Sequence, residues 1–318
     1  MLQIKIIKWV CKAIVVMGLA MNFGWVNAQD PVKPKTVLVT GAANGIGKAT
    51  AIAFAQKGYI TYATDKNISK MQDLTDLGCR VRYIDVTIDS IMVSEIRAIE
   101  AETGGIDILV NNAGYGQNGF LEELSIEKIQ QQFDVNVFGL IRMTQLVLPL
   151  MRERKSGRII NIGSVGGEFT TPGATAYHAS KWALESITDG FRGELRPFGI
   201  EVVLIKPGGV YTNFMSTANQ LYPEPMPESP YMEMREKFLA QSNAMFDLEN
   251  RTYGILTPEK VAEVIVKSAE KRKPKTRYRI GALAKITPRI RGLKSDRGFD
   301  KFMLRQFNVS TEKGESVF

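Results

Sequence analysis

Tyr177 and Lys181 stand four positions apart in the stretch AYHASKWALES, residues 176–186. Side chains with this spacing lie on one face of a helix, so the phenol and the ammonium could sit beside each other. A neighbouring cation favours the phenolate, which would let the phenol exchange a proton at neutral pH. The same spacing also arises by chance, with a tyrosine on the core and a solvated lysine, so the pair needs support from the rest of the chain.

A glycine-rich segment, TGAANGIG at residues 40–47, follows the first apolar run. Without a Cβ, its backbone N–H groups and the positive end of the next helix can approach a pyrophosphate closely. The candidate contacts are Gly41, Asn44, Gly45, Ile46 and Gly47.

The second apolar run ends in an acidic residue, Asp65. Its carboxylate could accept hydrogen bonds from ribose hydroxyls and would repel a 2′-phosphate. This favours NAD as the cofactor. Lys66 beside it could bind the extra phosphate, so NADP stays open.

These segments belong to an alternation of short β-branched runs and longer amphipathic stretches. The predicted strands are TVLVT, YITYAT, RVRYI, DILV, RIINI, IEVVLI and RYRI. One predicted helix follows the first strand and ends at residue 57, and the others lie near 68–77, 88–102, 125–151 and 174–196. Short strands separated by longer helices indicate a parallel sheet covered on both faces. We expect one doubly wound, Rossmann-like α/β domain over residues 36–281.

Residues 211–256 depart from this alternation. They carry four prolines between positions 223 and 230 and five methionines between positions 215 and 245. Because methionine adapts to irregular apolar surfaces, the segment is typical of a mobile lid over a site. The alternative is a simple surface excursion.

The chain resembles the classical short-chain dehydrogenase/reductase family over about residues 36–279. The resemblance rests on TGAANGIG at 40–47, NNAG at 111–114, Asn136 in FDVNVFG, Ser164 in IINIGSVGG, the Tyr177/Lys181 pair and KPGGVYT at 206–212. Six motifs in the family's order and at its spacing make a chance Tyr177/Lys181 pair the poorer explanation.

This resemblance implies an enzyme, an NAD(P)-dependent oxidoreductase that moves a hydride between a nicotinamide and a secondary alcohol or ketone. Tyr177 would transfer the proton, and Lys181 together with the nicotinamide charge would favour its phenolate. Ser164 would hold the substrate oxygen, and Asn136 would position a water linked to the lysine.

Further cofactor contacts follow from the resemblance by position. They are Asp85, Val86, Asn112, Ala113, Gly114, Tyr177, Lys181, Pro207, Gly208, Val210 and Thr212. Asp85 could equally cap the helix that follows it. His178 is next to the tyrosine, but adjacent helical positions point about 100° apart, so we expect it to face away, at the surface or an interface.

The bulk composition excludes some classes of site. The 318 residues are 44% apolar and 23% charged, which suits a substantial core. One histidine and two cysteines, Cys11 and Cys79, are too few for a structural zinc or iron–sulfur site or for a disulfide framework, so no metal is expected.

The net charge of +8 is unevenly distributed. Residues 271–318 hold 14 Lys and Arg against 4 Asp and Glu, the first 28 residues hold three lysines, and the remaining body carries −5. A basic end on an acidic body suggests contact with an anionic surface at that end, membrane or nucleic acid, more than a whole-domain nucleic-acid binder, and an ordinary solvated surface explains it as well. We expect a membrane surface and no nucleic-acid partner. Residues 282–307 are predicted to form helices against the body or a membrane surface.

The basic C-terminal extension, residues 282–318, resembles what is seen in the family branch that acts on steroids, retinoids and similar lipids. Together with the methionine-rich lid, it favours a bulky apolar alcohol or ketone as the substrate. In the family, helices matching those near 125–151 and 174–196 form oligomer faces, so a homo-oligomer is expected.

The first 28 residues have a basic start, an apolar run at 13–26 and the small-residue ending Val26-Asn27-Ala28. This layout predicts a secretory signal peptide cleaved after Ala28, since 14 apolar residues are short for a membrane span. An uncleaved anchor or a misassigned start are the alternatives. Export or anchoring follows from the pattern, but a body facing the cytoplasm stays open because a soluble nicotinamide cofactor is scarce elsewhere.

Two other functions compete with the enzyme. One is a catalytically idle dinucleotide-binding regulator or scaffold, and the other is a basic membrane- or nucleic-acid-binding protein. The intact Ser164, Tyr177 and Lys181 favour the enzyme.

Overall fold

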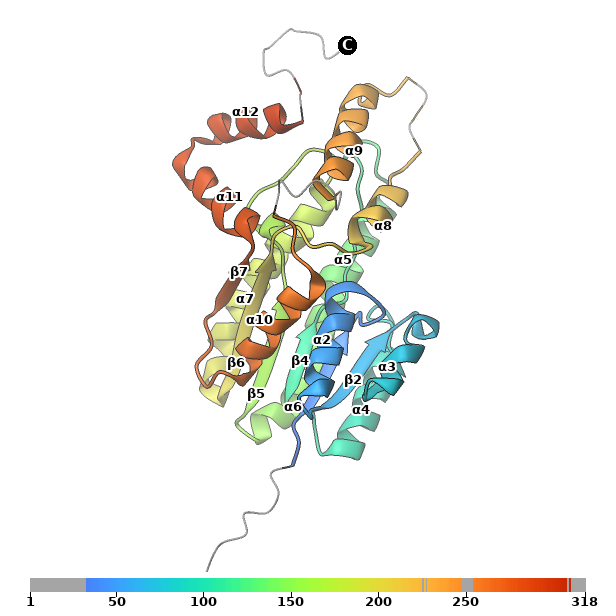
Figure 1. Ribbon diagram of the computed structural model, residues 1–318, viewed down its shortest axis with the longest axis vertical. Helices are drawn as coiled ribbons and strands as arrows, with labels where there is room; N and C mark the ends of the chain where they lie inside the picture. The colour runs from blue at the N-terminus through green and yellow to red at the C-terminus, as the bar shows by residue number, and fades with distance from the viewer. Residues whose placement is uncertain (1–32, 225, 227, 247–253, 308, 310–318) are drawn as a thin grey trace, which may run out of the picture. The chain divides into compact units, whose positions relative to one another are not determined.

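A parallel β-sheet forms the centre of the chain in this computed structural model (Figure 1). The structure describes residues 33–224, 226, 228–246, 254–307 and 309, and its sheet has seven strands in the order β3-β2-β1-β4-β5-β6-β7. All six pairings are parallel. The strands are β1 (Thr36–Thr40), β2 (Ile60–Asp65), β3 (Cys79–Tyr83), β4 (Ile108–Asn111), β5 (Gly157–Ile162), β6 (Ile200–Pro207) and β7 (Arg277–Ile280).

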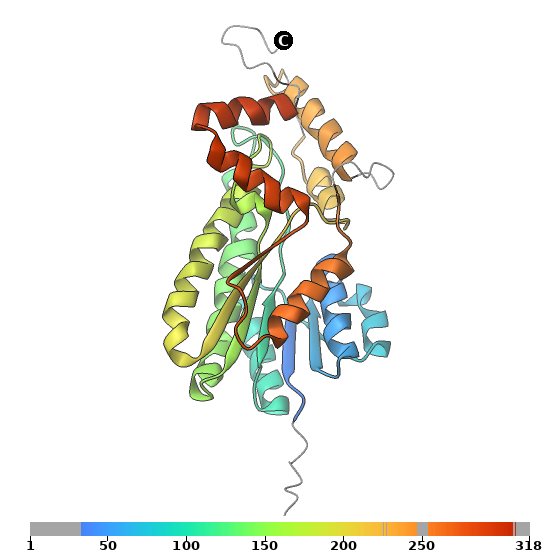
Figure 2. The same ribbon diagram turned by 60° about the vertical axis from the view of Figure 1, so that its left-hand side comes forward.

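Helices cover both faces of this sheet (Figures 1 and 2). The α-helices of the described residues are α2 (Gly45–Gln56), α3 (Gln72–Asp76), α4 (Asp89–Thr103), α5 (Ile126–Phe133), α6 (Leu140–Glu153), α7 (Thr175–Leu195), α8 (Phe214–Gln220), α9 (Met232–Phe246), α10 (Pro258–Glu270), α11 (Ala282–Leu293) and α12 (Asp296–Gln306). Apolar residues of α2, α3 and α10 form one buried layer, and those of α4 and α6 form the other. The predicted doubly wound α/β fold is confirmed.

Strand β1 shows why this sequence makes a covered parallel sheet. Its residues TVLVT are all buried. Val37 and Val39 join the α2 layer, whereas Leu38 between them joins the α4 layer, because successive side chains of a strand point to opposite faces.

The order of the strands reverses between β1 and β4. After β1 the chain builds β2 and β3 on one side, and then crosses to build β4 to β7 on the other. Such a switch point leaves a crevice at the carboxyl ends of the two strands, which is where open α/β sheets bind ligands. The glycine-rich turn and the NNAG motif both leave the sheet here.

Two predicted helices differ in detail from the observed ones. The stretch near 68–77 is a 3₁₀ turn (Ile68–Lys70) followed by α3, and the stretch near 125–151 is α5 and α6 joined by a π-helical segment, Asp134–Gly139. Helix α10 is an addition to the predicted pattern, although Thr257-Pro258 is a usual helix start.

One helical stretch of the described residues, Ile126–Glu153, is long and apolar enough to cross a bilayer by composition. Its α6 part buries Met143, Val147 and Met151 in the layer against the sheet. This is the position of a core helix. The predicted signal or anchor segment, residues 1–28, lies outside the described residues.

Beyond the sheet, the described residues of the proposed lid form α8 and α9. A third buried apolar cluster joins Phe238 of α9 to Phe299 and Met303 of α12 and to Phe120 from the loop after β4. Helix α12 therefore packs against the body, the first of the two arrangements predicted for residues 282–307.

Candidate active site

Hydrogen bonds fasten the two sides of the switch point together at Thr40. Its Oγ1 accepts from the backbone N of Asn112 at 3.1 Å and of Ala113 at 3.0 Å. The Asn112 amide in turn donates to the carbonyls of Thr40 at 3.0 Å and Gly41 at 2.9 Å. The predicted contacts of the TGAANGIG and NNAG motifs are thus brought side by side.

The glycine-rich turn has the shape of a phosphate cradle. Gly41 and Gly45 have φ angles of 66° and 55°, in the left-handed region where other residues are strained. A Cβ on Gly47 would overlap the carbonyl oxygen of Gly41. Helix α2 starts at Gly45, and the side chain of Asn44 does not cap it, so its first N–H groups are open to a ligand. These features fit a dinucleotide pyrophosphate.

Asp65 is held beside this turn. Its Oδ2 accepts from the backbone N of Ala43 at 3.1 Å, and its Oδ1 accepts from the backbone N of Asn67 at 2.9 Å. A carboxylate at the end of β2, next to the glycine turn, is placed as a ribose acceptor requires.

Asp85 and Val86 follow β3. The Asp85 carboxylate accepts from Thr87, at 2.9 Å from its backbone N and 2.7 Å from its hydroxyl. The residue at the cap of α4 is Ile88, so the alternative of Asp85 as the helix cap is wrong. Val86 is buried, and Gly139 provides the space for it.

The segment after β6 closes the other side of the crevice. Pro207 ends β6, Gly208 N donates to Ile280 O at 2.9 Å, and Val210 pairs with Leu256. A Cβ on Gly45 would lie 2.9 Å from Cγ2 of Thr212, so Thr212 packs against the glycine turn. Of these predicted cofactor contacts, Thr212 therefore lies against the TGAANGIG segment.

Ser164 and Tyr177 meet although they come from different elements. Ser164 follows β5, and its Oγ accepts from Gly166 N at 3.0 Å. Tyr177, in the first turn of α7, shares a hydrogen bond with the Ser164 side chain. Lys181 lies one turn further along α7, with Nζ 5.9 Å from the centre of the tyrosine ring and donating to Ile162 O at 3.0 Å.

Burial controls the acidity of both α7 side chains. It raises the pKa of Tyr177 to about 12, against a smaller lowering by the Ser164 hydrogen bond. It lowers the pKa of Lys181 to about 8. The sequence predicted a lowered tyrosine pKa from the lysine and nicotinamide charges. In the protein alone, desolvation of the phenolate outweighs the Ser164 hydrogen bond. The lowering expected from the lysine and nicotinamide charges together stays a prediction.

Asn136 lies in the π-helical segment and is buried. Its Oδ1 accepts from Tyr115 N, and its Nδ2 donates to Tyr115 O and Ser180 Oγ, all at 3.0 Å. Ser180 Oγ donates to Tyr177 O at 2.7 Å. Asn136 is thus tied to the tyrosine's own turn of α7 through Ser180, a residue that the sequence reasoning missed within the YHASK motif.

A buried chain of polar side chains was also missed. Asn111 donates at 3.0 Å to Thr144 and to Asn161, and Asn161 donates at 3.0 Å to Thr188. These residues belong to β4, α6, β5 and α7 and are at most 3% exposed. This row of hydrogen-bonded side chains fixes α7, and with it Tyr177, against the sheet. Its only signal in the sequence is asparagine inside otherwise apolar strands.

His178 is buried, so the predicted surface position is wrong. Its Nδ1 lies 2.9 Å from Gly166 O and its Nε2 lies 3.0 Å from Thr171 Oγ1. Burial lowers the pKa of the ring. The reason is tertiary: this face of α7 packs against the short turn η3 (Val165–Gly167) that follows Ser164.

Phe214, at the start of α8, covers the tyrosine from the side of the proposed lid. The two rings lie 5.3 Å apart. A Cβ on Gly116 would lie 3.1 Å from the Phe214 ring, so the loop after β4 contacts the same phenylalanine. An apolar wall therefore stands beside the Ser164/Tyr177 pair.

Comparison with known proteins shows the family of this chain. The family model described as short chain dehydrogenase matches residues 35–222. A 3-ketodihydrosphingosine reductase of Bacteroides thetaiotaomicron is 33% identical over 259 residues, covering 80% of this chain and 91% of that protein.

Solved structures give the same assignment. A short-chain dehydrogenase from Streptomyces avermitilis superposes with a TM-score of 0.70 at 30% identity, covering 88% of this chain and all of that one. The closed form of a serine dehydrogenase complexed with NADP+ superposes with a TM-score of 0.66 at 28% identity, covering 78% and 94%. The chain therefore belongs to the short-chain dehydrogenase family and is an oxidoreductase that uses a nicotinamide dinucleotide.

Proposed function

We propose that the enzyme interconverts a secondary alcohol and a ketone on a bulky, apolar molecule of steroid, retinoid or lipid type. The observation that carries this proposal is that Tyr177 interacts with both the Ser164 side chain and the Phe214 ring. The hydroxyl suits a carbonyl oxygen and the phenyl ring suits a hydrocarbon body. The relative named for a keto compound of sphingosine type supports the same class.

Each polar side chain then has a separate task. Ser164 donates a hydrogen bond to the substrate oxygen, and the bound nicotinamide supplies or accepts the hydride. With a pKa of about 12, Tyr177 is protonated at neutral pH and can donate its proton to the oxygen of a ketone as it becomes an alcohol. Lys181, with a pKa of about 8, is mostly charged at pH 7 and stabilises the phenolate that is left. Asn136 holds this part of α7 through Ser180.

Residues around the crevice would hold the dinucleotide. The glycine turn with Asn44 and Ile46 would bind the pyrophosphate, Asp65 the adenosine ribose, and Asp85 and Val86 the adenine. Asn112, Ala113 and Gly114 would follow the ribose and phosphates, and Pro207, Gly208, Val210 and Thr212 would contact the nicotinamide. We infer a preference for NAD from Asp65, because its carboxylate would repel a 2′-phosphate.

A spectrophotometric screen at 340 nm tests the function. NADH and NADPH are each offered with ketones of increasing apolar size, to wild type and to Tyr177→Phe. We expect turnover that improves with apolar size and that Tyr177→Phe lowers by about 10² to 10⁴-fold while cofactor fluorescence still reports binding. Equal turnover by both proteins would remove Tyr177 from the mechanism. Cofactor binding with no turnover of any ketone or alcohol would favour the idle regulator.

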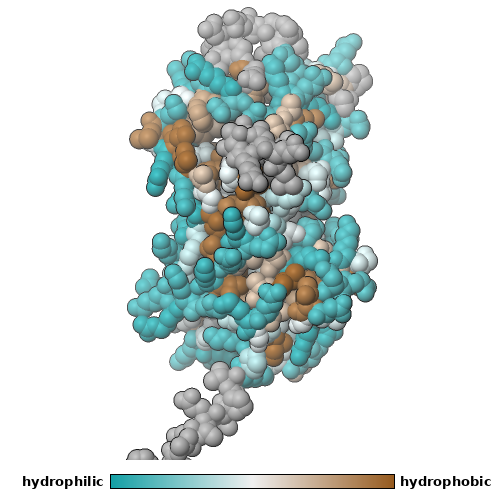
Figure 3. Space-filling model, in the orientation of Figure 1, coloured by the Kyte–Doolittle hydropathy of each residue, from teal (hydrophilic) through white to brown (hydrophobic). Residues whose placement is uncertain are grey.

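We also propose that α11 touches an anionic membrane surface. On one face of this helix, Ile286 is 51% and Leu293 is 87% exposed, beside exposed Lys285 and Arg289. Figure 3 shows brown, apolar side chains among teal ones where α11 meets α12. Exposed apolar residues flanked by cations fit a lipid surface better than nucleic acid.

The membrane proposal is tested with a fluorophore attached at Leu293→Cys in a chain whose Cys11 is replaced by serine, since Cys79 is buried. A blue shift with anionic but not zwitterionic vesicles is expected. A matched probe at Ile68→Cys, which is 45% exposed on another part of the body, should not shift. If both probes stay in water with anionic vesicles, α11 does not dock.

Two proposals concern the assembly and the N-terminus. Phe138 and Trp182 are 58% and 49% exposed on the helical segments predicted to form oligomer faces. Size-exclusion chromatography with light scattering should show a homo-oligomer that Trp182→Glu weakens. Residues 1–28 are proposed to direct export or anchoring, which N-terminal sequencing of the protein from cell fractions tests.

A further inference from the structure

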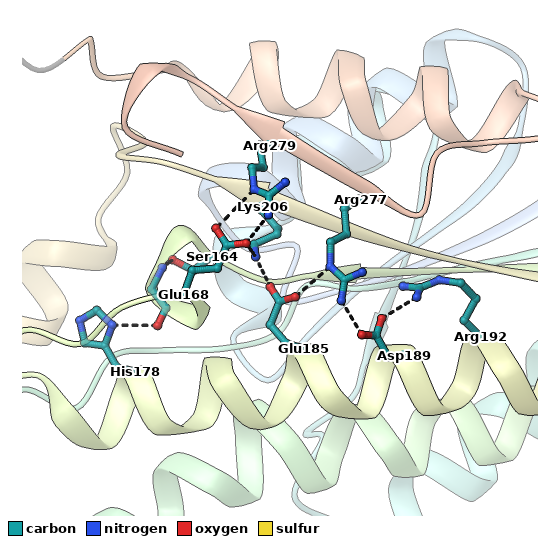
Figure 4. A network of polar contacts seen from close by, with 10 residues as sticks. Ser164, Glu168, His178, Glu185, Asp189, Arg192, Lys206, Arg277 and Arg279 are labelled. Atoms are coloured by element: carbon teal, nitrogen blue, oxygen red, sulfur yellow. Dashed lines mark hydrogen bonds and ion pairs between the residues drawn. The ribbon is translucent and has the colours of Figure 1, made fainter. Parts of the chain in front are cut away.

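Ser164 precedes a short turn, and both backbone groups of Gly166 in this turn, the N–H and the carbonyl, are hydrogen-bonded to side chains. Gly166 N donates to Ser164 Oγ at 3.0 Å, and Gly166 O lies 2.9 Å from Nδ1 of His178 (Figure 4). A Cβ on Gly166 would lie 2.8 Å from that Nδ1 and 3.3 Å from Ser164 Oγ. Only glycine fits between the serine and the histidine without moving one of them.

The partners of His178 define its tautomer. A carbonyl oxygen only accepts, so Nδ1 must carry the proton and donate to Gly166 O. Nε2 lies 3.0 Å from the Thr171 hydroxyl, which can donate to it or accept from it, and the backbone of Phe169 also hydrogen-bonds the ring. Both ring nitrogens are used to hold the segment that runs from Ser164 to Thr171.

The orientation of the Ser164 hydroxyl follows from this bracing. Because Oγ accepts from Gly166 N, that lone pair is occupied and the hydroxyl proton is left for the Tyr177 side, where the serine hydrogen bond is found. We propose that His178 is a positioning residue, which fixes Gly166 and so aims the Ser164 hydroxyl at the reacting oxygen. This inference rests on the proposed role of Ser164.

The far end of the same turn is anchored independently. Glu168 pairs with Lys206 Nζ at 2.5 Å and with Arg279, and Lys206, with none of its surface exposed, also pairs with Glu185 of α7 (Figure 4). With Glu168 held by charge, loss of the His178 bond should loosen Gly166 without unfolding the turn. The expected effect is therefore on turnover more than on folding.

A matched pair of variants separates the hydrogen bond from packing. His178→Asn keeps a donor near the place of Nδ1, whereas His178→Leu has a similar branched shape without a donor. We expect His178→Leu to lower kcat by about 10- to 100-fold, as misplaced catalytic groups do, with the Kd for NADH or NADPH unchanged. His178→Asn should recover most of this loss. Thr171→Val, which leaves the Nδ1 bond intact, should cost less than His178→Leu.

Several outcomes would overturn the inference. Full activity of His178→Leu would show that Ser164 needs no such brace, and equal impairment of the leucine and asparagine variants would show that packing alone matters. If His178→Leu does not fold, Gly166→Ala must give the same loss of kcat with cofactor binding intact. Tyr177→Phe is measured in parallel: its full activity would contradict the proposed function, whereas an inactive Tyr177→Phe beside a fully active His178→Leu contradicts only the role of His178.

Discussion

The ring of Phe214 in α8 lies 5.3 Å from the ring of Tyr177 in α7, at an interplanar angle of 59°. Phe214 comes two residues after the KPGGVYT segment that closes the cofactor crevice, and α8 continues towards α9. The residue that would transfer the proton is therefore in direct contact with the first helix of the proposed lid. Under the proposed function, substrate access and proton transfer would therefore involve one apolar surface.

Phe214→Ala should lower kcat/KM for a bulky apolar ketone by about 10- to 100-fold, since the lost apolar contact is worth about 1–3 kcal/mol. Steady-state kinetics with a bulky and a small ketone provide the measurement, and the small ketone should be affected less. Phe198→Ala, at an exposed ring in the turn after α7, is the control. An equal loss for both ketones would mean that Phe214 supports Tyr177 and does not contact the substrate.

Lys181→Met should change how stability depends on pH. The lysine pKa is about 8 in the folded protein and about 10.5 in the unfolded chain, so the unfolded chain binds the extra proton between these values and stability rises with pH across that window. Below pH 8 the folded protein bears the full cost of the buried ammonium, up to about 3 kcal/mol. At pH 7 the free energy of unfolding of Lys181→Met should exceed that of wild type. Between pH 7 and 9.5 it should rise much less than that of wild type.

Urea unfolding at pH 7, 8.5 and 9.5 measures this effect. The measurements stop at pH 9.5 because Tyr177 would add its own pH dependence above that value. The pKa of Tyr177 is raised in the folded protein, so its contribution to stability is lost as the pH rises above about 10. Lys260→Met, at an exposed position of α10, should leave the pH slope unchanged. The prediction is refuted if Lys181→Met keeps the wild-type slope.

Asp65→Ser should shift the cofactor preference towards NADPH. Removing the carboxylate removes its repulsion of a 2′-phosphate and its bonds to ribose hydroxyls, so the ratio of kcat/KM for NADPH over NADH should rise by about 10- to 100-fold. Asp85→Ser is the matched control: its carboxylate bonds Thr87 and is proposed to face the adenine, which NADH and NADPH share, so the ratio should stay unchanged. An unaltered ratio in Asp65→Ser would show that Asp65 does not select between the two nucleotides.

Lys206→Met should destabilise the fold strongly. Lys206 has none of its surface exposed and pairs with the largely buried carboxylates of Glu168 and Glu185. Removing one partner of a buried ionic cluster costs about 3–5 kcal/mol in the free energy of unfolding. Lys267→Met breaks an exposed pair with Glu263 at 3.9 Å and should cost less than about 0.5 kcal/mol. Urea unfolding that shows similar small losses for both variants would contradict the structural role of the cluster.

The sequence alone was sufficient for the sheet and for the location of the motifs. Neighbouring residues of a strand face opposite sides of the sheet, as Val37, Leu38 and Val39 do, so residue order alone indicates the two faces. Motifs at the ends of parallel strands must also meet at one edge of the sheet. Local patterns therefore predicted the fold class and the glycine turn, and the family resemblance implied that Ser164 and Tyr177 act together.

The tertiary structure decided what surrounds those residues. The burial of His178, the direction of the Tyr177 pKa and the contact of Phe214 with Tyr177 all depend on segments distant in sequence that pack against α7. The order of residues reveals the periodic spacing of apolar side chains along a single helix or strand. Desolvation and hydrogen-bond partners are properties of the packed chain, so they could be found only after α7, the Ser164 turn and α8 had been brought together.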